Sequence, residues 1–188
     1  MSKAVFLDRD GVVNRKAPKG LYITRWEDME FLPGVVEAIA LLKQAGFRVI
    51  VVTNQRCVAK GLLTVAQLEH MHQKMCALFA ARGAILDGVY YCPHEISPAC
   101  ECRKPAPGML LQAARDQRVE LADSWMIGDS EIDMLAGRRA GCRTAYLGPE
   151  ADATAGGADL CASSLLDATH RILKASDMRT SRHSVAES

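Results

Sequence analysis

Residues 4–11 read Ala-Val-Phe-Leu-Asp-Arg-Asp-Gly, and this stretch indicates the fold class. Four apolar residues in a row predict a strand that is buried on both faces, as in a parallel sheet covered by helices. The strand is expected to end at Asp8, and Gly11 permits a sharp turn just beyond it. Ligands bind at the carboxyl ends of the strands in such sheets, so Asp8 and Asp10 are the first candidates for a functional site.

Outward from this strand, short apolar runs alternate with longer amphipathic segments. Further strands are expected over residues 48–53, 88–92, 124–128, 143–147 and 158–162. Helices are expected over residues 35–44, from 64 to about 82, after 107, over 131–140 and from 165. The alternation predicts a three-layer α/β sandwich with a central parallel sheet. We expect one domain over residues 1–175, without a cap domain, and a disordered polar tail over 176–188.

The composition is that of an ordinary globular protein. The 188 residues are 49% hydrophobic and 24% charged, with a formal net charge of +1, which argues against a nucleic-acid surface. No apolar stretch approaches the roughly 20 residues of a membrane span, and no signal-peptide pattern follows Lys3. We expect a cytoplasmic monomer without nucleic-acid or membrane partners.

Asp8 and Asp10 can divide the work of a phosphatase between them. Asp8 would attack phosphorus and form an aspartyl-phosphate. Asp10 would protonate the leaving alkoxide and then deprotonate the water that hydrolyses the intermediate. Taken alone, the Asp-x-Asp-Gly pattern is weak, because it also occurs in polar turns and in calcium loops.

Two further motifs, one at an expected strand end and one at the base of a predicted helix, carry groups that suit a phosphate. After residues 49–52, the hydroxyl of Thr53 and the amides around Asn54 and Gln55 can bind phosphate oxygens. At the base of a predicted helix, Lys104 next to Arg103 offers a point charge to a phosphoryl group. Each motif by itself is as well explained by a polar loop or a solvated basic turn.

The last strand end adds a third acid, Asp129. Together with Asp8 and the backbone carbonyl of Asp10, it can give part of the octahedral oxygen shell that Mg²⁺ prefers. The ion would neutralise charge on the transferred phosphoryl group. Asp133, one helical turn further, is expected to orient a ligand or the lysine from behind, although an acid at a helix N-terminus is an equally good explanation.

A second metal site is predicted in the loop 92–102. It contains three thiols and one imidazole, from Cys92, His94, Cys100 and Cys102. Cys₃His is a closed tetrahedral set for a structural Zn²⁺, and the ion would position the adjacent Lys104. Reduced thiols without a metal are the alternative. The other four cysteines are scattered, and an odd count of seven argues against a disulfide framework.

The four strand-end motifs, in this order, resemble those of the haloacid dehalogenase superfamily, and the second acid, Asp10, resembles its phosphatase and phosphomutase branches. Residues 7–14, 53–55 and 92–109 are similar to one family within it, the zinc-containing phosphatases that lack a cap domain. The resemblance covers residues 4–148. It implies that Asp8 is the nucleophile, that Asp10 is the acid/base, and that Asp8, Asp10 and Asp129 surround Mg²⁺. It also implies phosphate contacts from Thr53, Asn54 and Lys104, and substrate contacts from Arg103 and the loop after Gln55.

This family includes phosphatases of D-glycero-D-manno-heptose 1,7-bisphosphate and of histidinol phosphate. Residues 31–34 and 58–62 are more similar to the heptose members, so the resemblance implies removal of the 7-phosphate on the route to nucleotide-activated heptose for cell-surface glycans. Two departures concern Arg56-Cys57, where heptose phosphatases often have Ser-Gly, and Ser130, where some relatives have lysine. The alternatives are a phosphatase of histidinol phosphate or another small sugar phosphate, a phosphomutase, and a non-catalytic zinc-stabilised binding module.

The second phosphate of a bisphosphate requires cations away from the reacting centre. Three segments can supply them: the loop after Asn14, which carries Lys16, Lys19 and Tyr22; residues 56–60, with Arg56 and Lys60; and Arg103.

Overall fold

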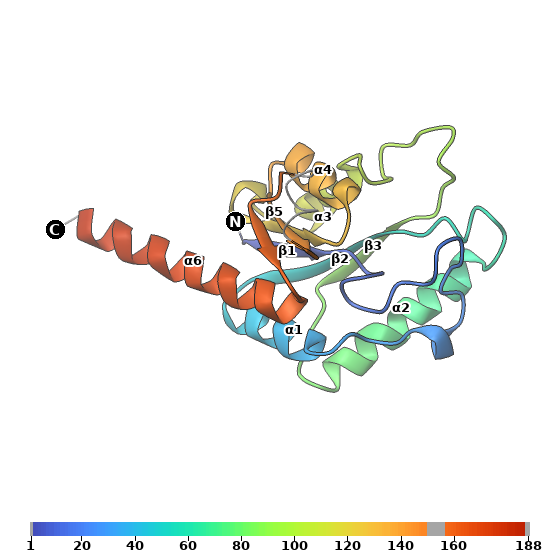
Figure 1. Cartoon of the computed structure of the whole chain (residues 1–188), viewed down its shortest axis with the longest axis horizontal. Helices are drawn as coiled ribbons and strands as arrows, with labels where there is room; N and C mark the ends of the chain where they lie inside the picture. The colour runs from blue at the N-terminus through green and yellow to red at the C-terminus, as the bar shows by residue number, and fades with distance from the viewer. Residues whose placement is uncertain (1, 150–156, 187–188) are drawn as a thin grey trace.

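The computed structural model describes residues 2–149 and 157–186, and within them six parallel strands form one sheet (Figure 1). The strands are β1 (Ala4–Leu7), β2 (Arg48–Asn54), β3 (Gly88–Cys92), β4 (Trp125–Gly128), β5 (Arg143–Leu147) and β6 (Leu160–Ala162). Their order is β3-β2-β1-β4-β5-β6, so the chain builds the sheet from β1 to β3 on one side and then crosses back to place β4 on the other side of β1. The crevice at such a reversal is where α/β sheets bind ligands.

Helices cover both faces of the sheet, which confirms the predicted three-layer sandwich (Figure 1). They are α1 (Val35–Gln44), α2 (Val65–Ala80), α3 (Gly108–Gln117), α4 (Glu131–Ala140) and α6 (Leu165–Ala186), with short 3₁₀ turns at Trp26–Asp28 and Leu121–Asp123. Alternate residues of each strand face opposite layers. Val5 and Leu7 therefore pack under α1, α2 and α6, whereas Ala4 and Phe6 pack under α3 and α4.

The expected helix starts are reproduced where the sequence carries a cap. Thr64 accepts a hydrogen bond from the backbone N–H of Gln67, and the Gln67 side chain accepts one from the backbone N–H of Thr64. This reciprocal capping box fixes the start of α2.

The helix α6 extends into the stretch that the sequence predicts to be a polar tail. Its first turns are anchored by Leu165, Ala168 and Ile172 in the core, and it then leads away from the body of the molecule to Ala186 (Figure 1). Adding a residue to an existing helix costs little, because each one brings a hydrogen bond. Residues 187–188 lie outside the described residues, and the disordered tail stays a prediction.

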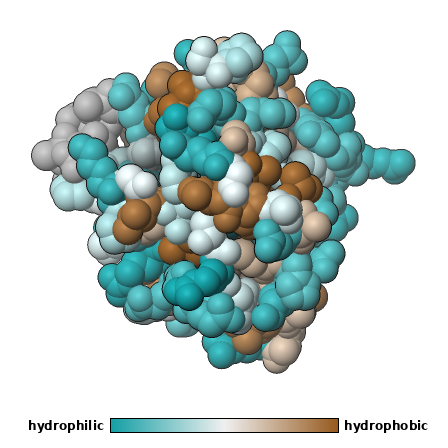
Figure 2. All heavy atoms as spheres, turned by 90° about the vertical axis from the view of Figure 1, so that its right-hand side faces the viewer, coloured by the Kyte–Doolittle hydropathy of each residue, from teal (hydrophilic) through white to brown (hydrophobic). Residues whose placement is uncertain are grey.

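The surface of the molecule is mixed. Figure 2 shows one face, on which hydrophobic side chains gather near the middle and hydrophilic ones surround them. In the described part of the chain, no helix has the length and apolar character to cross a membrane.

Candidate active site

The predicted motifs border one pocket of about 300 Å³, although Asp129 itself is not among the residues that line it. Asp8 follows β1, Thr53 and Asn54 end β2, and Lys104 precedes α3, and all four line the pocket. Its other walls come from Asp10, Gln55, Arg103, Ser130, Ile132 and the loop 16–23. A larger hollow of about 560 Å³ lies beside β6 and the start of α6, but it contains none of the strand-end acids of the motifs. Chemistry rather than size therefore identifies the site.

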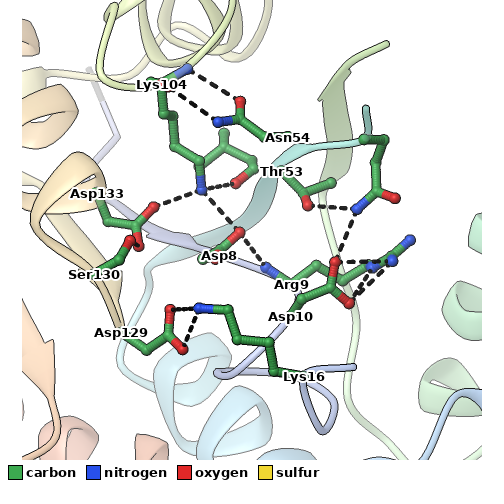
Figure 3. A network of polar contacts seen from close by, with 12 residues as sticks. Asp8, Arg9, Asp10, Lys16, Thr53, Asn54, Lys104, Asp129, Ser130 and Asp133 are labelled. Atoms are coloured by element: carbon green, nitrogen blue, oxygen red, sulfur yellow. Dashed lines mark hydrogen bonds and ion pairs between the residues drawn. The ribbon is translucent and has the colours of Figure 1, made fainter. Parts of the chain in front are cut away.

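Asp8 and Lys104 form the centre of this site (Figure 3). The ammonium of Lys104 donates to Oδ1 of Asp8 at 2.8 Å and to the carbonyl of Val52 at 2.9 Å, and it pairs with Asp133 at 2.6 Å. Burial raises the pKa of Asp8 to about 7, although the charge of Lys104 opposes that shift. Burial would lower the pKa of Lys104, but Asp133 and Asp8 outweigh it and raise this pKa. The lysine therefore stays charged in a fully enclosed position.

Asn54 lines the pocket and contacts the backbone of Lys104, and the phosphate contact that the resemblance implies for it stays a prediction. Its side-chain oxygen accepts a hydrogen bond from the backbone N–H of Lys104 at 3.1 Å, and its side-chain nitrogen donates to the carbonyl of Lys104 at 3.0 Å. Both ends of the amide thus hold the backbone of the lysine. In this structure Asn54 positions Lys104.

Asp10 lies beside Asp8, but its carboxylate is engaged elsewhere (Figure 3). It accepts hydrogen bonds from Arg9 at 2.9 and 3.0 Å, from Asn14 at 2.9 Å and from Gln55 at 3.0 Å. Burial would raise the pKa of Asp10, but Arg9 and these hydrogen bonds outweigh it and lower the pKa. A general acid needs a pKa near the working pH, so Asp10 has to loosen this contact with Arg9 before it can donate a proton.

Arg9 is itself held in place from behind. It is fully buried, and its guanidinium donates to Nε2 of His72, on α2, at 3.1 Å. That contact requires a neutral imidazole that carries its proton on Nδ1. Burial and the nearby charge of Arg9 lower the pKa of His72 to about 3, in agreement with a neutral ring.

The acids at the pocket fit a divalent cation. Oxygens of Asp8, Asp129 and Asp133 lie within 4.8 Å of one another. A Cβ on Gly11, whose φ is +103°, would lie 2.1 Å from Oδ2 of Asp129, so the backbone leaves room for that carboxylate and nothing larger. The carboxylate of Asp129 is paired with a cation in this structure, since the ammonium of Lys16 lies 2.9 and 3.0 Å from its two oxygens.

Asp133 lies behind this set of oxygens. It pairs with Lys104 and accepts a hydrogen bond from the hydroxyl of Ser130. A Cβ on Gly128 would lie 2.2 Å from that of Asp133, so α4 and β4 approach closely here. Asp133 is thus in direct contact with the lysine, as its predicted orienting role requires, and that role stays a prediction.

The four predicted zinc ligands also come together, within 4.8 Å of one another. The sulfur of Cys100 lies 3.5 Å from that of Cys92 and 3.4 Å from that of Cys102, and Nδ1 of His94 lies 3.2 Å from the sulfur of Cys102. All three cysteines are free thiols. Two sulfurs of a tetrahedral zinc site lie roughly 3.8 Å apart, because each Zn–S bond is about 2.3 Å. The cluster thus has the spacing of a four-ligand metal site.

The predicted substrate cations divide into two groups. Arg103 lines the pocket, and so does the loop that carries Lys16, Lys19 and Tyr22. Arg56 and Lys60 are not among the residues that line it. The Nε of Arg56 instead donates to Glu95, in the zinc loop, and Arg103 donates to the backbone carbonyl of His94 at 3.3 Å.

The contacts of Arg9 with His72 and of Asn14 with Asp10 were not evident from the sequence. Arg9 and Asn14 stand inside or next to the first motif, which is the one signal that could have pointed to them. His72 carries no such signal, because 63 residues separate it from Arg9.

Comparison with known proteins gives first the class and then the family. A family model described as HAD-hydrolase-like matches residues 101–167. Among curated proteins, the D-glycero-beta-D-manno-heptose-1,7-bisphosphate 7-phosphatase of Yersinia pestis is 42% identical over 151 residues, which cover 77% of this chain and 79% of that protein. The enzyme of the same name from Escherichia coli K12 is also 42% identical over 151 residues, which cover 77% and 78%.

Solved structures agree. The D,D-heptose 1,7-bisphosphate phosphatase of B. bronchiseptica, complexed with magnesium and phosphate, superposes with a TM-score of 0.83 at 34% identity, over 92% of this chain and 98% of that one. The corresponding enzyme of Burkholderia thailandensis gives a TM-score of 0.67 at 32% identity, over 91% and 98%. The chain belongs to the haloacid dehalogenase-like hydrolases, within the family of the heptose-bisphosphate phosphatases, and the predicted resemblance is confirmed.

Proposed function

We propose that this protein is a magnesium-dependent phosphatase that removes the 7-phosphate of D-glycero-D-manno-heptose 1,7-bisphosphate through a phosphoaspartate on Asp8. The observation that carries the proposal is the geometry at Asp8, in a chain that is 42% identical to enzymes with this activity. Asp8 directly follows a central strand, lines the pocket and is paired with a buried, charged lysine.

Asp8 is held in an attacking orientation by two donors on one oxygen. The backbone N–H of Arg9 and the ammonium of Lys104 both donate to Oδ1 at 2.8 Å. We therefore assign nucleophilic attack on phosphorus to Oδ2. The charge of Lys104 opposes the effect of burial on the pKa of Asp8 and so favours the ionised carboxylate, and it is also available to the oxygens of the phosphoryl group.

Asp10 supplies the proton for the leaving alkoxide once its contact with Arg9 loosens. The carboxylate is reached from the pocket, whereas Arg9 behind it is fully buried. A phosphorylated substrate that enters the pocket brings negative charge close to Asp10, and this favours the protonated acid. The same group then takes a proton from the water that hydrolyses the phosphoaspartate.

Asp8, Asp129 and Asp10 would hold the catalytic Mg²⁺, and Cys92, His94, Cys100 and Cys102 a structural Zn²⁺. When bound, magnesium supplies positive charge that stabilises the transferred phosphoryl group. The zinc loop ends directly before Arg103 and Lys104, so an ordered loop supports the position of both cations.

The setting of the enzyme follows the expectations from the sequence. We place it in the cytoplasm, where the free state of all seven cysteines is the normal one. We expect it to act as a monomer.

The test is phosphate release from a panel of substrates by purified enzyme with Mg²⁺. Heptose 1,7-bisphosphate should give the highest kcat/KM, ahead of histidinol phosphate and of simple sugar monophosphates. An Asp8→Asn variant serves as the blank, because an amide cannot form the covalent intermediate; its turnover should fall on the order of 10⁴-fold or more. A higher kcat/KM for histidinol phosphate would replace the proposed substrate, and substantial turnover by Asp8→Asn would remove Asp8 as the nucleophile.

A further inference from the structure

Lys16 forms an ion pair with Asp129 in this structure. Its ammonium donates to both carboxylate oxygens, at 2.9 and 3.0 Å, from a loop 113 residues away in the sequence (Figure 3). The pair spans the pocket edge, because Lys16 comes from the loop after β1 and Asp129 directly follows β4.

The two lysines at the site differ in how firmly they are held. The side chain of Lys104 is 1% exposed and has Asp8, Asp133 and the carbonyl of Val52 as partners. The side chain of Lys16 is 57% exposed, and that of Asp129 is 17% exposed. A long, half-exposed side chain gives up such a pair at low cost, since exposed ion pairs are worth little. Lys16 is therefore the cation that can leave.

Lys16 and a magnesium ion need the same oxygens. Magnesium binds carboxylate oxygens at about 2.1 Å in a near-ideal octahedron. An ammonium that stays within hydrogen-bonding distance of those oxygens would lie only a few ångströms from the ion, and two cations that close repel each other strongly. The two ways of neutralising Asp129 exclude each other.

We infer that Lys16 competes with magnesium for Asp129, so that this lysine sets the metal affinity of the site, and that metal binding releases its ammonium to a phosphate of the substrate in the same pocket. The inference rests on the proposed magnesium dependence. Its second half follows from position: Lys16 lines the same pocket as Asp8, Asp10 and Arg103, where the phosphate of a substrate would bind.

The inference predicts that Lys16→Ala strengthens the binding of magnesium and weakens the binding of substrate. Magnesium should bind about twofold to fivefold more tightly, which is the worth of a partly exposed ion pair. At saturating magnesium, KM for the phosphorylated substrate should instead rise by roughly threefold to tenfold, because a charged hydrogen bond is lost. A variant that merely damaged the site would weaken the binding of both.

Metal affinity is measured without catalysis, by calorimetric titration with Mg²⁺ and by the loss of the free-ion EPR signal of Mn²⁺. Lys16→Arg keeps the competing cation and should behave like the parent. Lys19→Ala removes the same charge from the same loop, and among the contacts of the described residues Lys19 has no ion pair with Asp129. Its metal affinity should therefore match that of the parent.

Unchanged or weaker metal binding by Lys16→Ala would overturn the inference, as would an equal gain in Lys19→Ala, which would indicate a general charge effect. An unchanged KM would overturn the release of Lys16 to substrate. These results are separable from the proposed function. A shifted metal affinity in a protein that hydrolyses none of the panel would count against the function alone, and unchanged affinity in an active enzyme against the Lys16 inference alone.

Discussion

At the scale of single residues, Arg9 separates the two acids of the first motif. Asp8 is paired with Lys104 and has a raised pKa of about 7, whereas Asp10 is paired with Arg9 and has a lowered pKa. Two carboxylates only two positions apart thus have opposite shifts. As they stand, these shifts run opposite to the proposed roles, because a nucleophile has to be ionised and a proton donor protonated. Bound Mg²⁺ would favour the ionised form of Asp8, and loss of the contact with Arg9 would raise the pKa of Asp10.

Asp10→Asn tests this division of roles. The variant should lose about 10²- to 10⁴-fold in the first chemical step with a sugar phosphate, whose alkoxide needs a proton. It should lose far less with 4-nitrophenyl phosphate, whose leaving group departs as an anion. Rapid mixing resolves the first step, and equal losses with both esters would refute the role of Asp10 as the acid.

His72 links the first motif to the pH dependence of folding. Its pKa falls from 6.5 to about 3 in the folded protein, so below pH 6.5 the unfolded chain binds a proton that the folded protein does not. The stability that the neutral ring provides is fully present above pH 6.5 and declines as the pH falls toward 3. At pH 5 this residue lowers the free energy of unfolding by about 2 kcal/mol relative to its value above pH 6.5.

His72→Gln should remove that part of the acid sensitivity, because glutamine can accept the hydrogen bond from Arg9 without titrating. Urea unfolding at pH 5 and pH 7.5 measures it, as the difference between variant and parent. His70→Gln, at an exposed position of the same helix, is the matched control and should keep the parent's dependence. The same pH dependence in His72→Gln and the parent would exclude this source.

The sequence located the acids and the lysine but not their partners. Asp8 and Asp129 could be placed because polar residues directly follow apolar strands, and strand ends share an edge of the sheet. Lys104 could be placed because it stands at the base of a predicted helix. The partners depend on rotamers of residues that are far apart in the chain, as for Arg9 and His72. The dual hydrogen bonds of Asn54 to the Lys104 backbone are a second case.

At the scale of elements, the strands and helices were predictable because both cores require periodic apolar residues. The end of α6 was not, since residues after 176 carry no apolar period and the helix there is a continuation of its packed first turns. The clustering of Cys92, His94, Cys100 and Cys102 was predictable from ligand type and spacing alone. That His94 faces the cysteines through Nδ1 required the structure.

The zinc loop should carry about one tightly bound zinc per chain, which elemental analysis of purified protein measures. Cys100→Ser should lower the thermal unfolding midpoint and, with it, activity, because the loop that precedes Arg103 and Lys104 loses its anchor. Removing magnesium should stop activity with little effect on the midpoint. Cys161→Ser, outside the cluster, is the control; a chain without bound metal would contradict the site.

At the scale of the whole molecule, the described residues form no cap domain over the pocket, so loops must distinguish substrates. The Arg56–Glu95 pair joins the loop after β2 to the zinc loop, and Arg103 reaches the same loop through His94. The zinc loop therefore contacts two of the segments proposed to recognise substrate. The role of Arg56 and Lys60 in reading a distal phosphate stays a prediction.

The placement of these arginines predicts which one reads the second phosphate. Arg103→Ala should raise KM for the bisphosphate roughly tenfold, the worth of a charged hydrogen bond of about 1.5 kcal/mol. KM for a monophosphate should change little, and so should kcat, because the contact is equal in the ground and transition states. Arg56→Ala is the comparison: a larger effect there would mean that Arg56 leaves Glu95 to bind substrate.

The close approach of backbone to acid at Gly11 and Gly128 has a consequence for how the protein tolerates mutation. Neither position has room for a methyl group, since Asp129 and Asp133 lie little more than 2 Å from where it would stand. In a scan of all substitutions these two glycines would be as intolerant as Asp8, although they perform no chemistry. Positions around this pocket that do not tolerate substitution therefore include residues that shape the site as well as residues that react. The two kinds of residue can be distinguished only when folding and turnover are measured separately for each variant.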